Sequence, residues 1–183
     1  NEHGQLMEES VSPYFKKRLY TVGGEQLVEL GYLTKPVIGQ IHAERYNTDN
    51  IRVKANGQFD QASIDEAFVG HGKKTAGIVA DVINQANIRQ DKGVMFFAST
   101  VDHAKEVMAS LPSYNSALIT GETPKKERKQ IINDFKAQKI KYLCNVSVLT
   151  TGFDAPHVSL IAILRATESA SLLIQIIGRG LRL

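Results

Sequence analysis

The second half of the chain alternates short apolar runs with stretches in which apolar residues recur at the spacing of a helix. The apolar runs predict four strands, over residues 94–98, 116–120, 140–146 and 158–164. The stretches between and after them predict three helices, over residues 102–111, 124–137 and 169–177. Thr123 and Pro124 are predicted to start the second helix, as N-cap and first helical residue. Strands that alternate with amphipathic helices are typical of a parallel, doubly wound α/β sheet, which is the predicted fold class.

In the first half of the chain, apolar residues recur less regularly. Residues 1–20 mix charges with Pro13, which indicates a linker or a poorly anchored lead-in. The pattern then predicts a short helix over 24–30 with Gly31 as its C-cap glycine, a strand over 37–42 and a loop over 46–60. Ser63 and Glu66 have the spacing of a capping box, so Ser63 is predicted to N-cap a helical stretch, with a break near residues 70–72 left open.

These patterns divide the chain into three parts: a lead-in or linker (1–23), a connecting segment with helices (24–92) and a core domain (93–183). The length of 183 residues, 43% hydrophobic and 22% charged, fits an ordinary soluble domain with its own core. Neither end carries a tail, which suggests a piece cut from a longer polypeptide. Residues 1–92 hold 11 Lys and Arg against 12 Asp and Glu, whereas residues 93–183 hold 11 against 7, so a site for a polyanion is expected in the second half.

A single cysteine, Cys144, excludes an intramolecular disulfide, and no apolar run is long enough to span a membrane. A cytoplasmic location without a membrane partner is therefore expected. The five histidines lack the spacing of a metal site, so no metal ligands are predicted, and Cys144 is interpreted as a small buried side chain.

Two short segments resemble nucleotide-binding motifs but fail on inspection. The segment from Gly70 to Thr75 lacks the first glycine of a phosphate-binding loop and has Lys74 where that loop needs Ser or Thr. The acidic segment that begins at Asp65 does not follow a buried strand, and the capping box accounts for Glu66. Neither segment is predicted to bind ATP.

Four ordered segments of the second half carry the functional signal. The first predicted strand ends at Ser99 and Thr100, whose hydroxyls lie at the edge where parallel sheets bind ligands. The next strand ends at Thr120 and Gly121, beside a helix N-terminus that can bind an anion. Three cations follow that turn, and a solvated basic helix face remains the alternative interpretation of Lys125, Lys126 and Arg128.

The third segment, 145–156, ends a strand with hydroxyls, a glycine and Asp154 in an apolar context. The fourth, 175–182, ends a helix with Arg179 and Arg182 three residues apart, hence on one face if the turn continues. Two planar guanidinium groups placed in this way suit a phosphoryl group in transfer.

Together the four segments resemble motifs IV, V and VI of superfamily-2 helicases. The resemblance is clearest in the sequences TTGFDAP (150–156) and QIIGRGLRL (175–183). The sequence LVELGYLTKP (27–36) resembles the segment that leads out of the first motor domain. The chain is most similar to the bacterial RadD/YejH-like DNA-repair helicases, with restriction-enzyme motor subunits as close relatives. The resemblance implies a RecA-like sheet and the second of two motor domains. Val146 stands where many relatives place a threonine.

The resemblance also implies roles for single residues. Arg179 and Arg182 would reach the γ-phosphate of ATP across the cleft between the two domains, with one of them acting as arginine finger. Gln175 would couple the arginine helix to the first domain, while Gly152 and Asp154 would line the nucleotide side of motif V.

On the opposite rim, Thr100, Thr120, Gly121 and Thr150 would hold phosphates of a nucleic-acid strand, and backbone and hydroxyl contacts of this kind do not read sequence. The cofactors would be ATP and Mg²⁺, held mainly by the first motor domain, which would be a partner together with DNA.

The preferred function is therefore the second motor domain of an ATP-dependent DNA helicase or translocase in DNA repair, inactive in ATP hydrolysis on its own. A non-enzymatic nucleic-acid-binding module and a restriction-enzyme motor subunit are the alternatives. A Rossmann-type cofactor domain is disfavoured, because no G-x-G-x-x-G follows any predicted strand.

Overall fold

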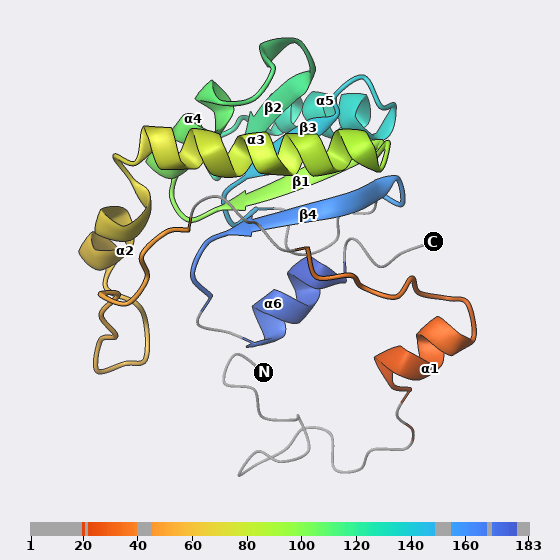
Figure 1. The fold of residues 1–183 in the computed structure, drawn as a ribbon, viewed down its shortest axis with the longest axis horizontal. Coiled ribbons are helices and arrows are strands. Elements are labelled where there is room, and N and C mark those ends of the chain that lie inside the picture. Colours follow the sequence, from red (N-terminus) through yellow and green to blue (C-terminus); the bar gives the residue numbers. More distant parts are fainter. Residues whose placement is uncertain (1–19, 21, 40–44, 149–154, 168–169, 179–183) are drawn as a thin grey trace.

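The computed structural model describes residues 20, 22–39, 45–148, 155–167 and 170–178. Its centre is a four-stranded parallel sheet in the order β2-β3-β1-β4 (Figure 1). The strands are β1 (Gly93–Ala98), β2 (Ser116–Ile119), β3 (Tyr142–Asn145) and β4 (Val158–Leu164). Helices cover both faces, so the predicted α/β fold class is confirmed.

Two pairs of helices cover the two faces of the sheet. One pair packs against alternate residues of β1, among them Val94 and Phe96, and the other packs against Met95 and Phe97. All six residues of β1 are buried, as expected for a central strand of a parallel sheet that is covered on both sides. The first pair is α3 (Gly72–Ile88) and α4 (Val101–Ala109), and the second is α5 (Lys125–Lys136) and α6 (Ala170–Ile177).

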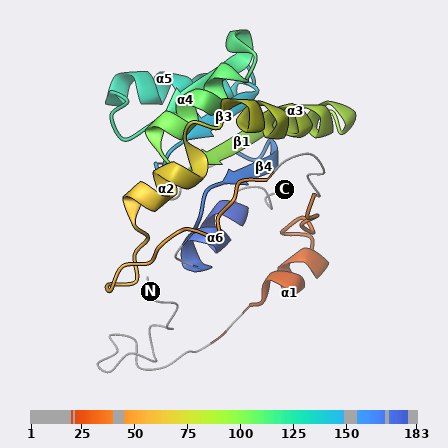
Figure 2. The same cartoon turned by 60° about the vertical axis from the view of Figure 1, so that its left-hand side comes forward.

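The N-terminal part contributes two further helices, α1 (Gly24–Glu29) and α2 (Gln61–Phe68). Helix α1 has no buried residue and stands away from the sheet in both views (Figures 1 and 2). Helix α2 packs through Ile64, Ala67 and Phe68 on a small cluster that includes Tyr46. No helix among the described residues is both long and apolar enough to cross a membrane.

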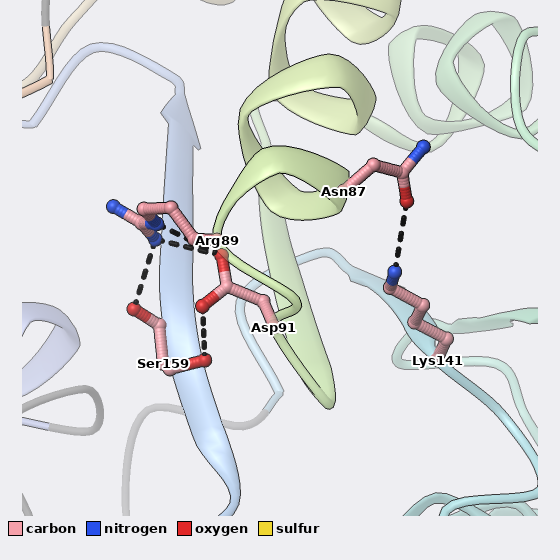
Figure 3. A network of polar contacts seen from close by, with 5 residues as sticks. All are labelled: Asn87, Arg89, Asp91, Lys141 and Ser159. Carbon is pink, nitrogen blue, oxygen red and sulfur yellow. Dashed lines mark hydrogen bonds and ion pairs between the residues drawn. The ribbon is translucent and has the colours of Figure 1, made fainter.

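A polar network fixes the C-terminal end of α3 at the start of the sheet (Figure 3). Asp91, which is 8% exposed, accepts from Arg89 at 2.8 Å and from the Ser159 hydroxyl at 2.5 Å. Lys141, just before β3, donates to Asn87 on α3 at 3.0 Å. These contacts join α3 to β4 and to the approach of β3, which sets how the helix lies across the sheet.

Gly93 allows β1 and β4 to start side by side. A Cβ atom at this position would lie 2.6 Å from the His157 ring and 3.2 Å from the His157 carbonyl oxygen. The second contact involves backbone and cannot be relieved by a side-chain rotation. Glycine is therefore required where β1 passes the turn that leads into β4.

Two predicted N-caps are wrong. Asp60, not Ser63, caps α2: its carboxylate accepts from the Ser63 amide at 3.1 Å, and the Ser63 hydroxyl donates to the Asp60 carbonyl. Helix α5 begins at Lys125, and the Thr123 hydroxyl oxygen accepts from the Thr120 amide in the preceding turn instead of from the helix. In both cases a side chain of a suitable type makes a different local bond.

Other boundaries agree closely with the sequence pattern. The strand predicted over 158–164 matches β4, Gly31 follows α1 with a φ of +75°, and the helical break lies at Gly70 with a φ of +80°. The strand predicted over 37–42 is not formed in residues 37–39, where Val37 and Ile38 are exposed, and residues 40–42 lie outside the described residues.

Candidate functional site

The carboxyl ends of the four parallel strands meet at one edge of the sheet. In the observed strand order, this edge presents the turn at Thr120 after β2, the turn at Ser147 after β3, the turn at Ser99 after β1, and Arg165 after β4. Neighbouring strands lie roughly 4.8 Å apart, so these turns together span about 15 Å. The sheet thus assembles three of the four segments singled out in the sequence.

At the end of β1, Thr100 is the N-cap of α4. Its hydroxyl oxygen accepts from the His103 amide at 3.2 Å. Ser99 contacts the ring of the same histidine: its amide donates to Nδ1 at 3.3 Å, and its hydroxyl lies 2.9 Å from that nitrogen. Both residues are half-buried. The turn predicted to bind phosphate is therefore built around a helix start and a buried histidine.

His103 itself is fully buried, and burial lowers its pKa to about 4, with His71 adding to the lowering and Glu106 opposing it. On the far side of the ring, Nε2 lies 2.9 Å from the Tyr46 hydroxyl. The ring is therefore neutral at physiological pH and has a hydrogen-bond partner at each nitrogen.

At the end of β2, the Thr120–Gly121 turn is held from inside. Thr120 is 7% exposed, and its hydroxyl oxygen accepts from the Glu122 amide at 3.2 Å. Arg128 Nη2 donates to the carbonyl oxygens of Thr120, Gly121 and Thr123, at 2.9, 3.3 and 3.3 Å. The guanidinium group therefore shapes this turn through Nη2.

The outer side of the same turn is open. Gly121 is exposed, and a Cβ atom there would meet nothing within 4 Å. Helix α5 begins without a side-chain cap, and Lys125 and Lys126 at its start are exposed. Uncapped amides at a helix N-terminus next to two lysines favour an anion.

At the end of β3, Asn145 is fully buried and donates through Nδ2 to the Phe96 carbonyl at 3.0 Å. Ser147 follows with a φ of +56°, a left-handed conformation that is uncommon for serine. Arg165, directly after β4, donates to the Ser147 hydroxyl at 2.9 Å. The start of the segment predicted as motif V is thus tied to the neighbouring strand. The predicted site residues Thr150, Gly152 and Asp154 lie outside the described residues.

On α6, Gln175 is exposed and Ile176 is buried against the sheet. Arg179 and Arg182, predicted to act on a γ-phosphate, lie outside the described residues. Among the residues that the structure describes, no group of His, Cys, Asp or Glu side chains could hold a metal ion. Cys144 is buried as expected, and burial raises its pKa to about 12.

Sequence reasoning missed three residues of this edge. Arg128 was counted with the neighbouring lysines, and the partners of His103 and of Arg165 were not anticipated. Arg165 could have been noticed as a charge directly after an apolar strand. The contact between His103 and Tyr46 joins positions 57 residues apart, so no local sequence pattern could predict it.

Comparison with known proteins decides the family. Residues 76–183 match the family described as the helicase conserved C-terminal domain. The chain belongs to this family. The motor-domain resemblance to superfamily-2 helicases is thereby confirmed at the level of the domain.

Several curated proteins share sequence with this chain. It is 45% identical over 69 residues to a Saccharomyces cerevisiae protein assigned as the ATP-dependent helicase IRC3, covering 38% of this chain and 10% of that protein. It is 32% identical over 124 residues to UvrABC system protein B of Streptococcus mutans, covering 60% and 18%. It is 28% identical over 168 residues to a 51.5 kDa protein of a Lactococcus phage, covering 89% and 33%. The chain therefore spans a third or less of the length of these relatives.

Solved structures share the fold. A fragment assigned to the HsdR subunit of a type I restriction enzyme from Vibrio vulnificus gives a TM-score of 0.53 at 24% identity, covering 61% of this chain and 24% of that one. The C-terminal domain of Dbp5 from S. cerevisiae gives 0.50 at 22% identity, covering 61% and 66%. At these identities the likeness concerns the architecture alone.

Proposed function

We propose that this helicase domain is the second motor domain of an ATP-dependent DNA helicase or translocase. The observation that carries the proposal is the family match over residues 76–183, which includes every segment that meets at the carboxyl edge of the sheet. The likeness to a protein assigned as an ATP-dependent helicase supports the use of ATP. DNA repair is the proposed setting, in line with the resemblance to RadD/YejH-like helicases and the likeness to UvrABC system protein B.

The domain would contribute only part of a nucleotide site. Gln175 is exposed on α6, and that helix leads toward Arg179 and Arg182, which would neutralise the charge that develops on the γ-phosphate. Gly152 and Asp154 would complete this side. By the resemblance to superfamily-2 helicases, Mg²⁺ and most phosphate contacts are assigned to the first motor domain of the same polypeptide. ATP supplies the bond whose hydrolysis drives movement.

The strand would run along the other part of the edge. There the exposed Gly121, the uncapped start of α5, Thr100 and Thr150 would meet its phosphates, with Lys125 and Lys126 adding charge. Thr120 is buried, so we assign it the role of shaping the turn through its bonds to Glu122 and Thr123. Such contacts hold a strand of any sequence, as a translocating motor requires.

The arginine assignment is tested in the longest natural polypeptide that contains this domain. Arg179→Lys and Arg182→Lys each keep the charge and remove the planar fork, so the variant at the finger should lose about 10³- to 10⁵-fold in ATP turnover. Nucleotide affinity, supplied mainly by the first domain, should be retained. Arg52→Lys is the matched control, because Arg52 is exposed and its guanidinium group pairs with Asp60 at the surface. Normal turnover in both arginine variants would rule out the finger.

Strand binding is tested by titration of fluorescent single-stranded DNA at several salt concentrations. We expect the logarithm of the association constant to fall linearly with the logarithm of salt, with a slope of about −0.7 for each phosphate neutralised. Lys125→Ala with Lys126→Ala should reduce this slope by about one to two units. The exposed lysine Lys54 provides a control for general charge, as Lys54→Ala. Binding that does not respond to salt would exclude a strand-phosphate site at this edge.

A further inference from the structure

One partly buried chain of hydrogen bonds joins the connecting segment of the N-terminal half to the carboxyl edge of the sheet. We call it the His103 relay, and its members are Ser99, His103, Tyr46, Thr75 and Glu106. Tyr46 belongs to the segment before α2, Thr75 lies in α3, and His103 and Glu106 lie in α4. The relay therefore connects three parts of the chain that are far apart in sequence: the segment around Tyr46, α3, and the Ser99 turn with α4.

The direction of each bond in the relay is determined by chemistry. The Ser99 amide can only donate, so Nδ1 of His103 accepts and carries no proton. A neutral ring then has its proton on Nε2, which donates to the Tyr46 oxygen at 2.9 Å. The Tyr46 hydroxyl donates to Thr75 Oγ1 at 2.9 Å, and Thr75 faces Glu106 Oε2 at 3.4 Å. Each donor has an acceptor, and the relay ends on a carboxylate.

The relay is enclosed by aromatic packing. The Tyr46 ring lies edge-on to the His103 ring at 5.1 Å and 5.0 Å from the Phe68 ring, and Phe68 lies 5.4 Å from His103. His103 and Thr75 are fully buried. A buried histidine with both nitrogens bonded is often only a satisfied core residue. Here, however, one nitrogen contacts the binding edge, and the other contacts a segment outside the sheet and its four covering helices.

Glu106 fixes the far end of the relay. Its other carboxylate oxygen accepts from the Gly70 amide at 2.5 Å, in the left-handed turn that separates α2 from α3. A displacement of α2 or of the segment around Tyr46 would thus disturb the hydrogen bonds of Glu106, Tyr46 and His103 together. Well-satisfied buried networks of this kind specify one arrangement, because any partial opening leaves polar groups unpaired.

We propose that Tyr46 and His103 are positioning residues for the strand-binding edge: they hold the Ser99–Thr100 turn in register with the segment that enters the domain. Movement of that segment would change how the turn meets a nucleic-acid phosphate. The inference rests on the proposed strand-binding function of this edge. It adds a physical link between the N-terminal connecting segment and the strand contact.

Tyr46→Phe is the test, because it removes one hydroxyl and keeps the ring that packs on Phe68 and His103. Tyr114→Phe is the matched control, since Tyr114 is 85% exposed and lies away from the relay. In the longest natural polypeptide, the DNA concentration that gives half-maximal ATPase stimulation should rise about 3- to 10-fold, as for loss of one net hydrogen bond, while kcat is unchanged. In a ¹⁵N-labelled sample, the His103 ring nitrogens and the Ser99 and Thr100 amides should shift. The control should change none of these.

The outcomes separate this inference from the proposed function. If the wild-type protein binds DNA and Tyr46→Phe leaves both the half-saturating DNA concentration and the Ser99 amide unchanged, the positioning role is refuted and the proposed function stands. If the wild-type protein binds no DNA, the proposed function fails and the strand-binding half of the inference fails with it. Should Tyr46→Phe not fold, Thr75→Val removes the next acceptor of the relay and is expected to shift the same signals.

Discussion

Acidification should destabilise the domain through His103. Burial lowers the pKa of this ring from its usual 6.5 to about 4, helped by His71 and opposed by Glu106; Tyr46, which faces Nε2, is neutral in this range. The unfolded chain therefore takes up a proton on this ring near pH 6.5, whereas the folded chain takes it up only near pH 4. Stability from the neutral ring is fully present above pH 6.5 and is lost as the pH falls toward 4.

The size of the effect follows from the two pKa values. One unit of difference corresponds to about 1.4 kcal/mol, so moving from about pH 7 to about pH 4.5 should remove about 2 kcal/mol of unfolding free energy. A typical domain has only about 5 to 15 kcal/mol in total. Protonation would also place a second donor against the Ser99 amide, so the loss should be accompanied by movement of the Ser99–Thr100 turn.

Urea unfolding at a series of pH values measures this loss, with His103→Gln as the variant that cannot titrate. Asp60 and Asp134, whose pKa values are lowered by hydrogen bonds, also lose stabilising contacts in acid, but they do so equally in both proteins. The difference between the two curves isolates His103. A difference that stays flat between about pH 6.5 and pH 4.5 would show that the ring is not held neutral by the fold.

Three further outcomes are expected. Cys144, buried and with its pKa raised to about 12, should react with a thiol reagent only as fast as the domain unfolds, which a urea series of reaction rates would show. Asp60→Ala should lower the unfolding free energy by about 1 kcal/mol through loss of the α2 cap, whereas Asp60→Asn should retain most of it. Asp91→Ala removes the acceptor at the centre of Figure 3 and should cost about 1 to 3 kcal/mol, against almost nothing for Asp102→Ala, whose partner Lys105 is exposed.

The period of apolar residues was sufficient to predict the sheet. Residues 158–164 form β4 as expected, and the strand predicted over 94–98 is β1 with one residue added at its start. These strands are recognisable because burial on both faces leaves continuous apolar runs between helical patterns. The strand predicted over 37–42 rested instead on an alternation of apolar and polar residues, yet Val37 is 81% and Ile38 93% exposed. Alternation predicts a strand only where a neighbouring strand and a covering layer exist.

The misassigned caps show a different limit. Asp60 and Ser63 are both good N-caps within one turn, and Thr123 is a good cap next to Pro124. Sequence preference ranks residue types as N-caps. It does not say which of two suitable side chains is already hydrogen-bonded to an amide outside the helix. The Arg52 amide donates to Ser63 Oγ, and the Thr120 amide donates to Thr123 Oγ1. Both competing donors lie outside the helix: Arg52 is 11 residues before Ser63, and Thr120 belongs to the turn before α5, so helix preferences alone do not reveal these bonds.

In the candidate site, the sequence predicted which residue types are present. It did not predict which side chains face solvent and which face the protein. Lys125, Lys126 and Arg128 look equivalent in sequence, and a solvated basic face was as acceptable as an anion site. Arg128 donates through Nη2 to three carbonyls of the preceding turn, so this nitrogen is already engaged in shaping the backbone. The side chains that differ in direction are therefore Lys125 and Lys126, which are exposed, and Arg128, which is half-buried against the turn.

The turn after β1 follows the same design, with His103 in place of Arg128. In each case an inward-facing polar side chain fixes the backbone from the protein side: His103 Nδ1 accepts from the Ser99 amide, and Arg128 donates to the carbonyls around Gly121. Gly121, which has no side chain and is exposed, leaves main-chain atoms at the surface of the second turn, and their position depends on the fold and not on a flexible side chain. Donors of this kind bind phosphate but cannot distinguish bases. A site that is held in place from the protein side, and whose contacts do not depend on base identity, fits the proposed role of a motor domain that moves along a strand of any sequence.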